Sequence, residues 1–555
     1  MTFEDFSMLF QFTGGLGMFL YGMKMMANGL QKTAGEKMKH LMGVLTNNRF
    51  TAIMVGALIT AIIQSSGATT VMVIGFVNAS IMTLTQAVGV IMGANIGTTI
   101  TAWIVSAGQL GDLFTALKPE FYAPLMIGFG AFFVMFAKKE RKQNIGEIFV
   151  ALGLLFVGLS WMSGAIKPYT DAPIFAQAFT LLGGNPLLGI FIGALITTIM
   201  QSSSASIGVL QTLAMNGVVT TNAAVYICLG SNIGSCYTAI LSSIGASKNA
   251  KRAAAINLLF NCFGVLIFGT IAVMMFVLNK SLAHATINSV QISIFHTAFN
   301  LINTVIMFPL ANFLVKVSGM IVKDTEQTQQ NIEARNAMEW HLDDRIMRTP
   351  SFAIEATADE VLHMGRLVTE NVKLAVETTI SHNEEEIQKV FQLEQTINKY
   401  EKRLTEYLVK INNLSLTDHQ HKVVKNLMYT INDLERVGDH AENIVELAES
   451  MIRDNLSFSE DAARELREMN QHVIGALEDA LEARRSSNLD FVVGTFSHEE
   501  KVDDLEDNIR ERYILRLSRN ECCIECGVIF MDIISNLERV SDHAVNVAEY
   551  VQDEK

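Results

Sequence analysis

The sequence has few acidic residues in its first part. Only 8 of its 56 Asp and Glu residues lie in residues 1–316, which contain 16 of its 42 Lys and Arg residues. None of these acids is in the middle of an apolar run, whereas carriers driven by protons use a buried titratable group. Little beyond His296 offers one, so the sequence disfavours proton coupling. Residues 317–555 have 26 basic and 48 acidic side chains, and so acidic a segment repels nucleic acids.

Cysteine is scarce as well, and the usual nucleotide loop is missing. Six scattered cysteines do not predict a disulfide framework. The cluster Cys522, Cys523 and Cys526 lacks a second ligand pair, so helix packing is the favoured interpretation and a metal or redox site the lesser one. No glycine-rich loop precedes Lys-Ser or Lys-Thr, so ATP is not expected to power this chain, and we expect no enzyme. The N-terminus lacks the basic region of a signal peptide.

What the sequence has in quantity is long apolar runs. Runs of a length that spans a membrane lie near residues 8–30, 84–106, 122–137, 146–166, 222–243, 253–278 and 289–316. We therefore predict an all-α protein with a transmembrane domain over residues 1–316, a linker over 317–345 and a helical domain over 346–555. Two further apolar stretches, at about 50–80 and 187–215, are each interrupted by a polar Gln-Ser-Ser motif.

The two motifs belong to an internal duplication. Gln64-Ser65-Ser66 returns 137 positions later as Gln201-Ser202-Ser203, and Gly93 to Gly97 returns at the same offset as Gly230 to Gly234. Matches in one register predict two copies of one unit, at about 8–140 and 146–280, followed by a final helix at 289–316.

Loop charges predict the orientation of the copies, if each motif forms a re-entrant hairpin. Eleven Lys and Arg residues then lie on one face and three on the other, and the basic face is cytoplasmic. The C-terminal domain is then cytoplasmic too, and the protein is a multi-pass protein of the inner or plasma membrane, in contact with lipids. The two copies have opposite orientations, and inverted repeats with broken helices are typical of secondary transporters.

Neutral oxygen atoms are concentrated at the two breaks. Hydroxyl, amide and carbonyl oxygens suit sodium, and free helix N-termini bind anions. The alternative is that small polar residues only let helices pack closely, which is preferable for Thr60 or Thr197 alone. The predicted substrate and sodium ligands are Gln64, Ser65, Ser66, Thr69, Asn95, Thr98, Gln201, Ser202, Ser203, Ser204, Asn232 and Ser235.

The paired Gln-Ser-Ser motifs, each followed 29 residues later by Gly-x-Asn-Ile-Gly, resemble the type II sodium/phosphate cotransporter family. The resemblance covers about residues 8–316 and implies sodium-driven transport of inorganic phosphate, with both ions held between two hairpins. The first copy has Gly67 where the second has Ser204, so one hydroxyl is missing there.

The soluble part contains a second duplication. Six helices are predicted at 352–380, 385–412, 419–453, 460–487, 490–519 and 522–552, which indicates two three-helix bundles. Leu434 to Asn443 returns 103 positions later as Leu537 to Asn546. In each copy a Glu and an Asp lie four residues apart on one helix face, where like charges repel unless a metal ion or an arginine neutralises them. A solvated acidic face is the plain alternative.

This repeated segment resembles the PhoU family, and the resemblance covers about residues 345–552. The resemblance implies a regulatory role, with iron or zinc held by Glu-x-x-x-Asp faces. The candidate metal ligands are Glu435, Asp439, Glu499, Asp503, Glu538 and Asp542. The first half departs from the pattern, since it has Glu394 followed by Asn398. His440 and His543 are either ligands or helix-packing side chains.

The leading hypothesis is therefore a sodium-coupled phosphate transporter with a regulatory domain, and a homodimer is one expected state. A membrane-anchored phosphate sensor without net transport is the alternative. A di-metal hydrolase is poorly supported, because no nucleophile accompanies the acidic faces.

Overall fold

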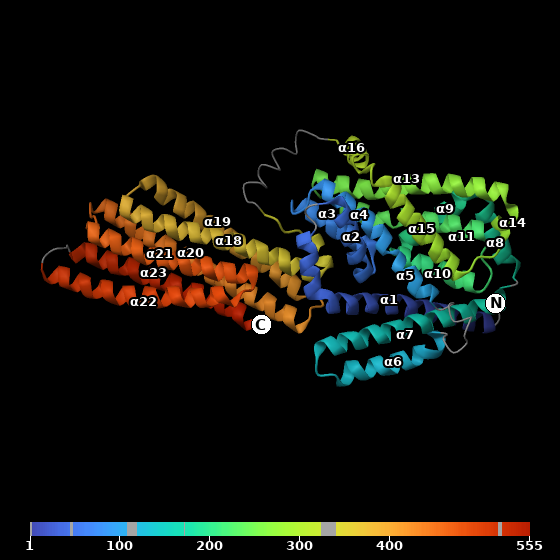
Figure 1. Cartoon of the computed structure of the whole chain (residues 1–555), viewed down its shortest axis with the longest axis horizontal. Coiled ribbons are helices and arrows are strands. Elements are labelled where there is room, and N and C mark those ends of the chain that lie inside the picture. The colour runs from blue at the N-terminus through green and yellow to red at the C-terminus, as the bar shows by residue number, and fades with distance from the viewer. Residues whose placement is uncertain (1–2, 45–47, 108–118, 171, 324–339, 520–523) are drawn as a thin grey trace. The chain divides into compact units, whose positions relative to one another are not determined.

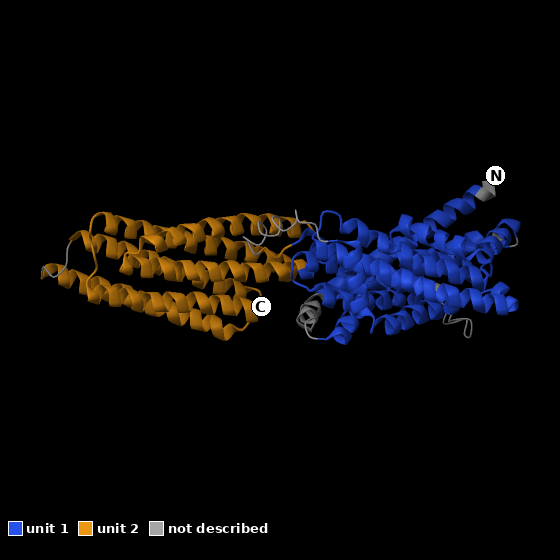
Figure 2. Cartoon of the chain, turned by 90° about the horizontal axis from the view of Figure 1, so that it is seen from above, with its two compact units in different colours: residues 1–333, 343–352 blue, residues 334–342, 353–555 orange. Residues whose placement is uncertain are grey.

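The computed structural model describes residues 3–44, 48–107, 119–170, 172–323, 340–519 and 524–555 (Figure 1). These residues form helices and no strand, apart from one isolated bridge between Thr220 and Thr286. The prediction of an all-α protein is confirmed. The chain divides into two compact units, Met1–Glu333 with Asp343–Phe352, and Ala334–Leu342 with Ala353–Lys555 (Figure 2).

The first unit contains most of the helices. They are α1 (Phe3–Val44), α2 (Arg49–Ile63), α3 (Ser66–Asn78), α4 (Leu84–Gly97), α5 (Thr99–Ser106), α6 (Pro119–Phe136), α7 (Glu140–Ile166), η3 (Lys167–Tyr169), α8 (Pro173–Gly184), α9 (Pro186–Met200), α10 (Ser203–Met215), α11 (Thr221–Gly234), α12 (Cys236–Ser242), α13 (Lys248–Leu278), α14 (Lys280–His284), α15 (Ser289–Met307), α16 (Ala311–Ile321) and η4 (Asp344–Arg348). The prediction of one last helix over 289–316 is wrong, because α15 and α16 are separate.

Five stretches of the described residues are long and apolar enough to cross a membrane. They are Leu84–Ser106, Glu140–Tyr169, Thr221–Ser242, Lys248–Leu278 and Ser289–Met307. A sixth arises if α8 and α9, which meet at 112°, count as one span. The predicted run at 8–30 lies within α1, and the run at 122–137 lies within α6 except for its last residue; neither helix is among the five. The length and apolar character of these helices are those of a membrane protein.

Within each copy, a glycine lets two neighbouring helices pack closely, and the contact is the same in both copies. A Cβ atom on Gly93 of α4 would lie 2.0 Å from the Ile53 carbonyl oxygen of α2. A Cβ atom on Gly230 of α11 would lie 1.9 Å from the Ile190 carbonyl oxygen of α9. No larger residue fits at such a contact. The Gly-x-Asn-Ile-Gly motif thus has a packing role: it fixes each broken helix against its neighbour.

The second unit is made of six long helices. They are α18 (Pro350–Ser381), α19 (Glu384–Asn412), α20 (Asp418–Arg453), α21 (Glu460–Ser486), α22 (Leu489–Ser518) and α23 (Ile524–Asp553). Their starts follow from local capping: Thr417 and Gln420 form a capping box at α20, and Ser459 caps α21. Helix α20 packs on α19 and α23, and α21 packs on α22 and α23, so the contact between α20 and α23 joins α19 and α20 to α21, α22 and α23.

Candidate functional site

Both Gln-Ser-Ser motifs interrupt a helix with the same backbone. Gln64 ends α2 in the left-handed region at φ 58°, and Gln201 ends α9 there at φ 52°. The next residue, Ser65 or Ser202, is extended and caps the following helix, its Oγ accepting from Ala68 N or Ala205 N. Left-handed backbone costs a residue with a Cβ about 1 kcal/mol or more. A strained turn kept in both copies indicates that the break has a function.

Each break places a helix N-terminus inside the first unit. Helices α3 and α10 begin at Ser66 and Ser203, which are 8% and 7% exposed. The first N–H groups of a helix have no partner within it, and its dipole makes that end positive. The buried hydroxyl groups of Thr69 and Ser206 lie in the first turns of the two helices. The arrangement is suited to bind an anion.

A chain of hydrogen bonds joins the two breaks through α5. Ser204 Oγ, in the first turn of α10, donates to Thr101 Oγ1 at 3.3 Å and lies 3.4 Å from Thr98 Oγ1. Thr101 Oγ1 in turn donates to Gln64 Oε1 at 2.7 Å. Residues of the two copies therefore meet in one polar site. Sequence reasoning missed Thr101, because only the packing of α5 on α10 brings it there.

The corresponding contact, between the first turn of α3 and α12, lacks a hydroxyl. Gly67 and Thr238 are the counterparts of Ser204 and Thr101, and they too lie together, since a Cβ on Gly67 would be 2.9 Å from Thr238 Oγ1. The two glutamines also differ: Gln64 accepts from Thr101, whereas Gln201 is exposed. The site is symmetric in backbone but not in chemistry.

The remaining predicted ligands lie deep in the helices next to the breaks. Asn95 and Asn232 are 3% and 2% exposed, and each donates its Nδ2 to the carbonyl four residues earlier, which leaves its Oδ1 available as an acceptor. Ser235 donates to the carbonyl of Asn232, and Thr69 donates to the carbonyl of Ser65. These side chains supply oxygen atoms and no charge.

A row of buried polar side chains on α15 was not predicted. Ser293, His296, Asn300 and Asn303 recur every three or four residues along one face, each at most 1% exposed. Asn300 and Asn303 donate their Nδ2 atoms to the carbonyls of His296 and Phe260. Their Oδ1 atoms and both ring nitrogens of His296 have no partner among the described residues. The sequence contains this spacing of three and four residues. It was overlooked because the stretch as a whole is apolar.

Gln211 of α10, the helix that begins at the second break, connects this row with α5. Its Nε2 donates to Ser293 Oγ at 2.9 Å and to the Ala102 carbonyl at 3.0 Å. Its Oε1 is again unpartnered within the described residues. Acceptor atoms are thus in excess along α10 and α15, and this excess is what a cation or water molecules would satisfy.

The segment before α18 is part of the first unit. Arg345 of η4 donates to the carbonyls of Ser242, at 2.6 Å, and Ile244, at 3.2 Å, at the end of α12. Asp343 accepts from Arg345 and from Asn78 at the end of α3. The predicted linker over 317–345 therefore does not hold for its last residues, which are docked where α3 and α12 end.

In the second unit, three carboxylates converge in the first half. Glu394, Asp439 and Glu442 each place an oxygen within 4.8 Å of the others. Burial, then Asp439, Glu442 and Glu435, raises the pKa of Glu394 to about 8. Both Glu394 oxygens are without a hydrogen-bond partner in the described part of the chain. Glycine makes this approach possible, because a Cβ on Gly438 would lie 2.5 Å from Glu394 Oε2.

This cluster differs from the predicted one. Glu442 was missed because it breaks the repeat, the second half having Val545 at that place. In the second half, burial and neighbouring carboxylates raise the pKa values of Glu499, Asp503 and Glu538. Ligands that are all carboxylates suit hard cations better than zinc. These carboxylates therefore suit a cation, but nothing in the cluster supports iron or zinc in particular.

The two motif histidines pack α20 against α23. His440 Nδ1 lies 2.8 Å from Asn536 Oδ1, and His543 Nδ1 lies 2.7 Å from Asp433 Oδ1. Asp433 and Asn536 are also 103 residues apart, so the two pairs are copies of one contact. The packing interpretation of these histidines agrees with the contacts.

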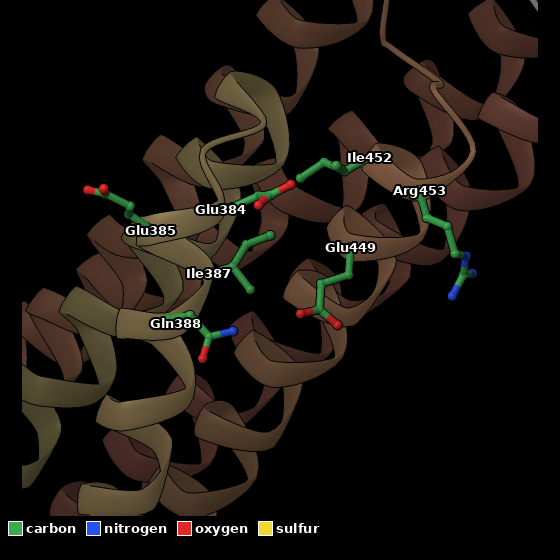
Figure 3. A pocket seen from close by; sticks show the side chains of 7 residues that line it. All are labelled: Glu384, Glu385, Ile387, Gln388, Glu449, Ile452 and Arg453. Atoms are coloured by element: carbon green, nitrogen blue, oxygen red, sulfur yellow. The ribbon is translucent and has the colours of Figure 1, made fainter.

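A surface cavity of about 580 Å³ lies between the start of α19 and the end of α20 (Figure 3). It is lined by Glu384, Glu385, Ile387, Gln388, Glu449, Ile452 and Arg453. The lining residues include three carboxylates and one arginine, and this net negative charge disfavours phosphate. Of the predicted cysteine cluster, Cys522 and Cys523 lie outside the described residues. Cys526 is disulfide-bonded, which the sequence analysis did not predict.

Comparison with known proteins gives matches over both units. The family model described as Na+/Pi-cotransporter matches residues 18–164 and 172–304, and the PhoU domain model matches 361–448 and 466–551. YjbB of Escherichia coli K12, whose name describes inorganic phosphate export, is 24% identical over 98% of both chains. YqeW of Bacillus subtilis is 29% identical over 57% of this chain and 98% of its own. PhoU from Pseudomonas aeruginosa, a solved structure, matches 36% of this chain and 96% of its own at 23% identity, with a TM-score of 0.35.

Proposed function

Because the chain belongs to the Na+/Pi-cotransporter family and has PhoU domains in its C-terminal half, we propose that it is a secondary transporter of inorganic phosphate, coupled to sodium and regulated through its second unit. The observation that carries this proposal is the hydrogen-bonded chain from Ser204 through Thr101 to Gln64, which joins the two helix breaks.

Phosphate fits the two helix N-termini. Its charge is complementary to the positive ends of α3 and α10, and its oxygens accept from free N–H groups and from hydroxyls. The sequence has no lysine or arginine within ten residues of Gln64 or of Gln201. A site without fixed positive charge holds phosphate weakly unless cations accompany it, and this is the physical reason for coupling phosphate to sodium.

Sodium fits the surplus of oxygen acceptors. Asn95 and Asn232 each have an amide oxygen available beside the breaks, and Gln211, Asn300 and Asn303 extend this supply along α10 and α15. Neutral oxygens replace the hydration shell of an alkali cation. We assign sodium to these positions, and the phosphate to the hydroxyls of Ser66, Ser203 and Ser204.

The topology that suits this function is the one predicted from the loops. The two copies form inverted repeats, the breaks are the tips of re-entrant hairpins, and the second unit is cytoplasmic. Alternating access then consists of movement of one copy against the other around the shared site. The ion gradients set the direction of flux, and the name of the Escherichia coli relative favours export in the cell.

Regulation acts through the docked segment. Asp343 and Arg345 contact the ends of α3 and α12, and the chain continues from them directly into α18. A change in the second unit can thus reach helices that begin at the site. The carboxylate clusters, which include Glu394 in the first half and Glu499 in the second, are the proposed cation sites of that regulatory unit.

The test is phosphate flux into vesicles that contain the purified full chain. We expect uptake of labelled phosphate to follow an imposed sodium gradient and to be lost when potassium or choline replaces sodium. Equal uptake in all three salts would remove the coupling. Phosphate binding without any flux would favour the sensor, the second candidate function, whose support is the intact second unit.

A further inference from the structure

Two histidines of the second unit face one another, and one of them, His498, directly precedes Glu499 of the second carboxylate motif. His472 lies on α21 and His498 on α22, with their Nδ1 atoms 3.1 Å apart and their ring centroids 5.3 Å apart. The other ring nitrogen of His498, Nε2, lies 4.0 Å from Asp479 Oδ2. Both rings are partly exposed, so a small ion can reach them from solvent.

Two glycines make room for this arrangement. A Cβ on Gly475 of α21 would lie 2.6 Å from the His498 ring, and a Cβ on Gly494 of α22 would lie 2.3 Å from Asp479 Oδ2. Glycine inside a helix costs about 1 kcal/mol relative to alanine. Helix α21 thus loses stability at Gly475, where the ring of His498 inserts. Helix α22 loses stability at Gly494, where the carboxylate of Asp479 inserts.

The distances match a metal site with two imidazole ligands. Nitrogen ligands about 2.0–2.1 Å from one zinc ion are roughly 2.9–3.4 Å apart at angles between square and tetrahedral. A histidine ligand commonly donates its second N–H to a carboxylate, which fixes the tautomer. Asp479 Oδ2 lies 4.0 Å from His498 Nε2, so it would have to approach by about 1 Å to accept this hydrogen. A plain hydrogen bond between the two histidines explains the distance between their Nδ1 atoms equally well, and the titration described below decides between the two interpretations.

We propose that His472 and His498 bind a divalent transition-metal ion such as zinc through their Nδ1 atoms, with Asp479 as the outer partner of His498. Water, or the carboxylate of Glu468 one turn before His472 on α21, completes the coordination. The ion ties α21 to α22. This site is separate from the all-carboxylate cluster of Glu394, because imidazole nitrogen selects a softer ion than carboxylate oxygen does.

The experiment is zinc titration of the purified, chelator-stripped full chain by calorimetry. We expect binding that weakens at least tenfold in His472→Gln and in His498→Gln, and about tenfold in Asp479→Asn, the usual effect of an outer-shell change. His419→Gln, an exposed histidine of α20, is the matched control and should bind as the unaltered chain does. Glu394→Gln should leave this zinc site unchanged.

A spectroscopic measurement on the unaltered chain guards against variants that fold poorly. Copper(II) loaded at one equivalent should give an electron paramagnetic resonance signal with coupling to two imidazole nitrogens. A signal with oxygen ligands only would overturn the proposal. So would zinc affinity that is unchanged in the two histidine variants, or an absence of zinc binding. Because neither readout involves phosphate or sodium, its outcome is independent of the transport test.

Discussion

The two helix breaks of the first unit share a backbone and differ in side chains. Both put a glutamine in the left-handed region and a serine at the next cap. The second copy then has Ser204, which reaches Thr101 of the first, whereas the first copy has Gly67 facing Thr238 with no hydroxyl. The backbone of the two breaks is therefore a property that the two copies share. The side-chain contacts at the breaks are the property in which the copies differ.

The second unit repeats this lesson. The first half has Gly438 and Glu442 where the second has Ser541 and Val545. Glycine admits the buried Glu394, and Glu442 adds a third carboxylate. In both units a departure from the repeat, rather than the repeat itself, marks the side chains that make the two copies unequal.

The largest expected effect separates the two glutamines. Gln64→Ala removes the acceptor of Thr101 and leaves a buried hydroxyl without its partner, so sodium-driven phosphate uptake should fall at least tenfold. Gln201→Ala, at the exposed counterpart, is the matched control and should cost less. Equal losses in the two variants, measured in vesicles, would mean that the breaks are not chemically distinct.

The next effect separates Glu394 from its counterpart Glu499. Since burial raises the pKa of Glu394 from 4.5 to about 8, the fold favours its protonated form. The stability that this carboxyl contributes is full below pH 4.5 and is lost as the pH rises through about 8. In the presence of a chelator, Glu394→Gln should therefore stabilise the chain by up to about 5 kcal/mol at pH 9 and by little at pH 5.

The measurement is urea or thermal unfolding of the second unit within the full chain, followed at the two pH values. Glu499→Gln, whose carboxylate is less buried, should change stability much less at either pH. A Glu394→Gln variant with the same stability gain at pH 5 and pH 9 would contradict the assigned titration.

A smaller effect tests the missing hydroxyl. Gly67→Ser places an Oγ beside Thr238, as Ser204 lies beside Thr101, and should change the apparent sodium or phosphate affinity two- to threefold. Gly67→Ala adds the same Cβ without the hydroxyl and is the control. If both variants behave alike, the effect is steric and the hydroxyl has no part in binding.

The smallest effect concerns the docked segment, which contacts Asn78 of the first copy and Ser242 and Ile244 of the second. Arg345→Ala removes the hydrogen bonds to Ser242 and Ile244 and should change the transport rate about twofold, with little loss of stability. Arg348→Ala, on the same turn but exposed, should have no effect. Identical rates for both variants would argue against coupling through this segment.

Sequence reasoning located what is local and repeated. The positions of both breaks follow from Gln64 and Gln201 in their apolar runs, and helices of the second unit were placed within a few residues because caps such as Thr417 are local signals. Thr101 and Asp343 could not be found, since only tertiary packing brings them to α10 and α3. Glu442 was overlooked because it is the residue at which the repeat fails.

The most direct test of the account is a double-mutant cycle between Thr101→Val and Ser204→Ala, read out as sodium-driven phosphate uptake. If the two copies form one site, each single variant should lose uptake three- to tenfold and the double variant should be little worse than either single one. Losses that multiply in the double variant would show that the two hydroxyls act independently, and would contradict a site shared between the breaks.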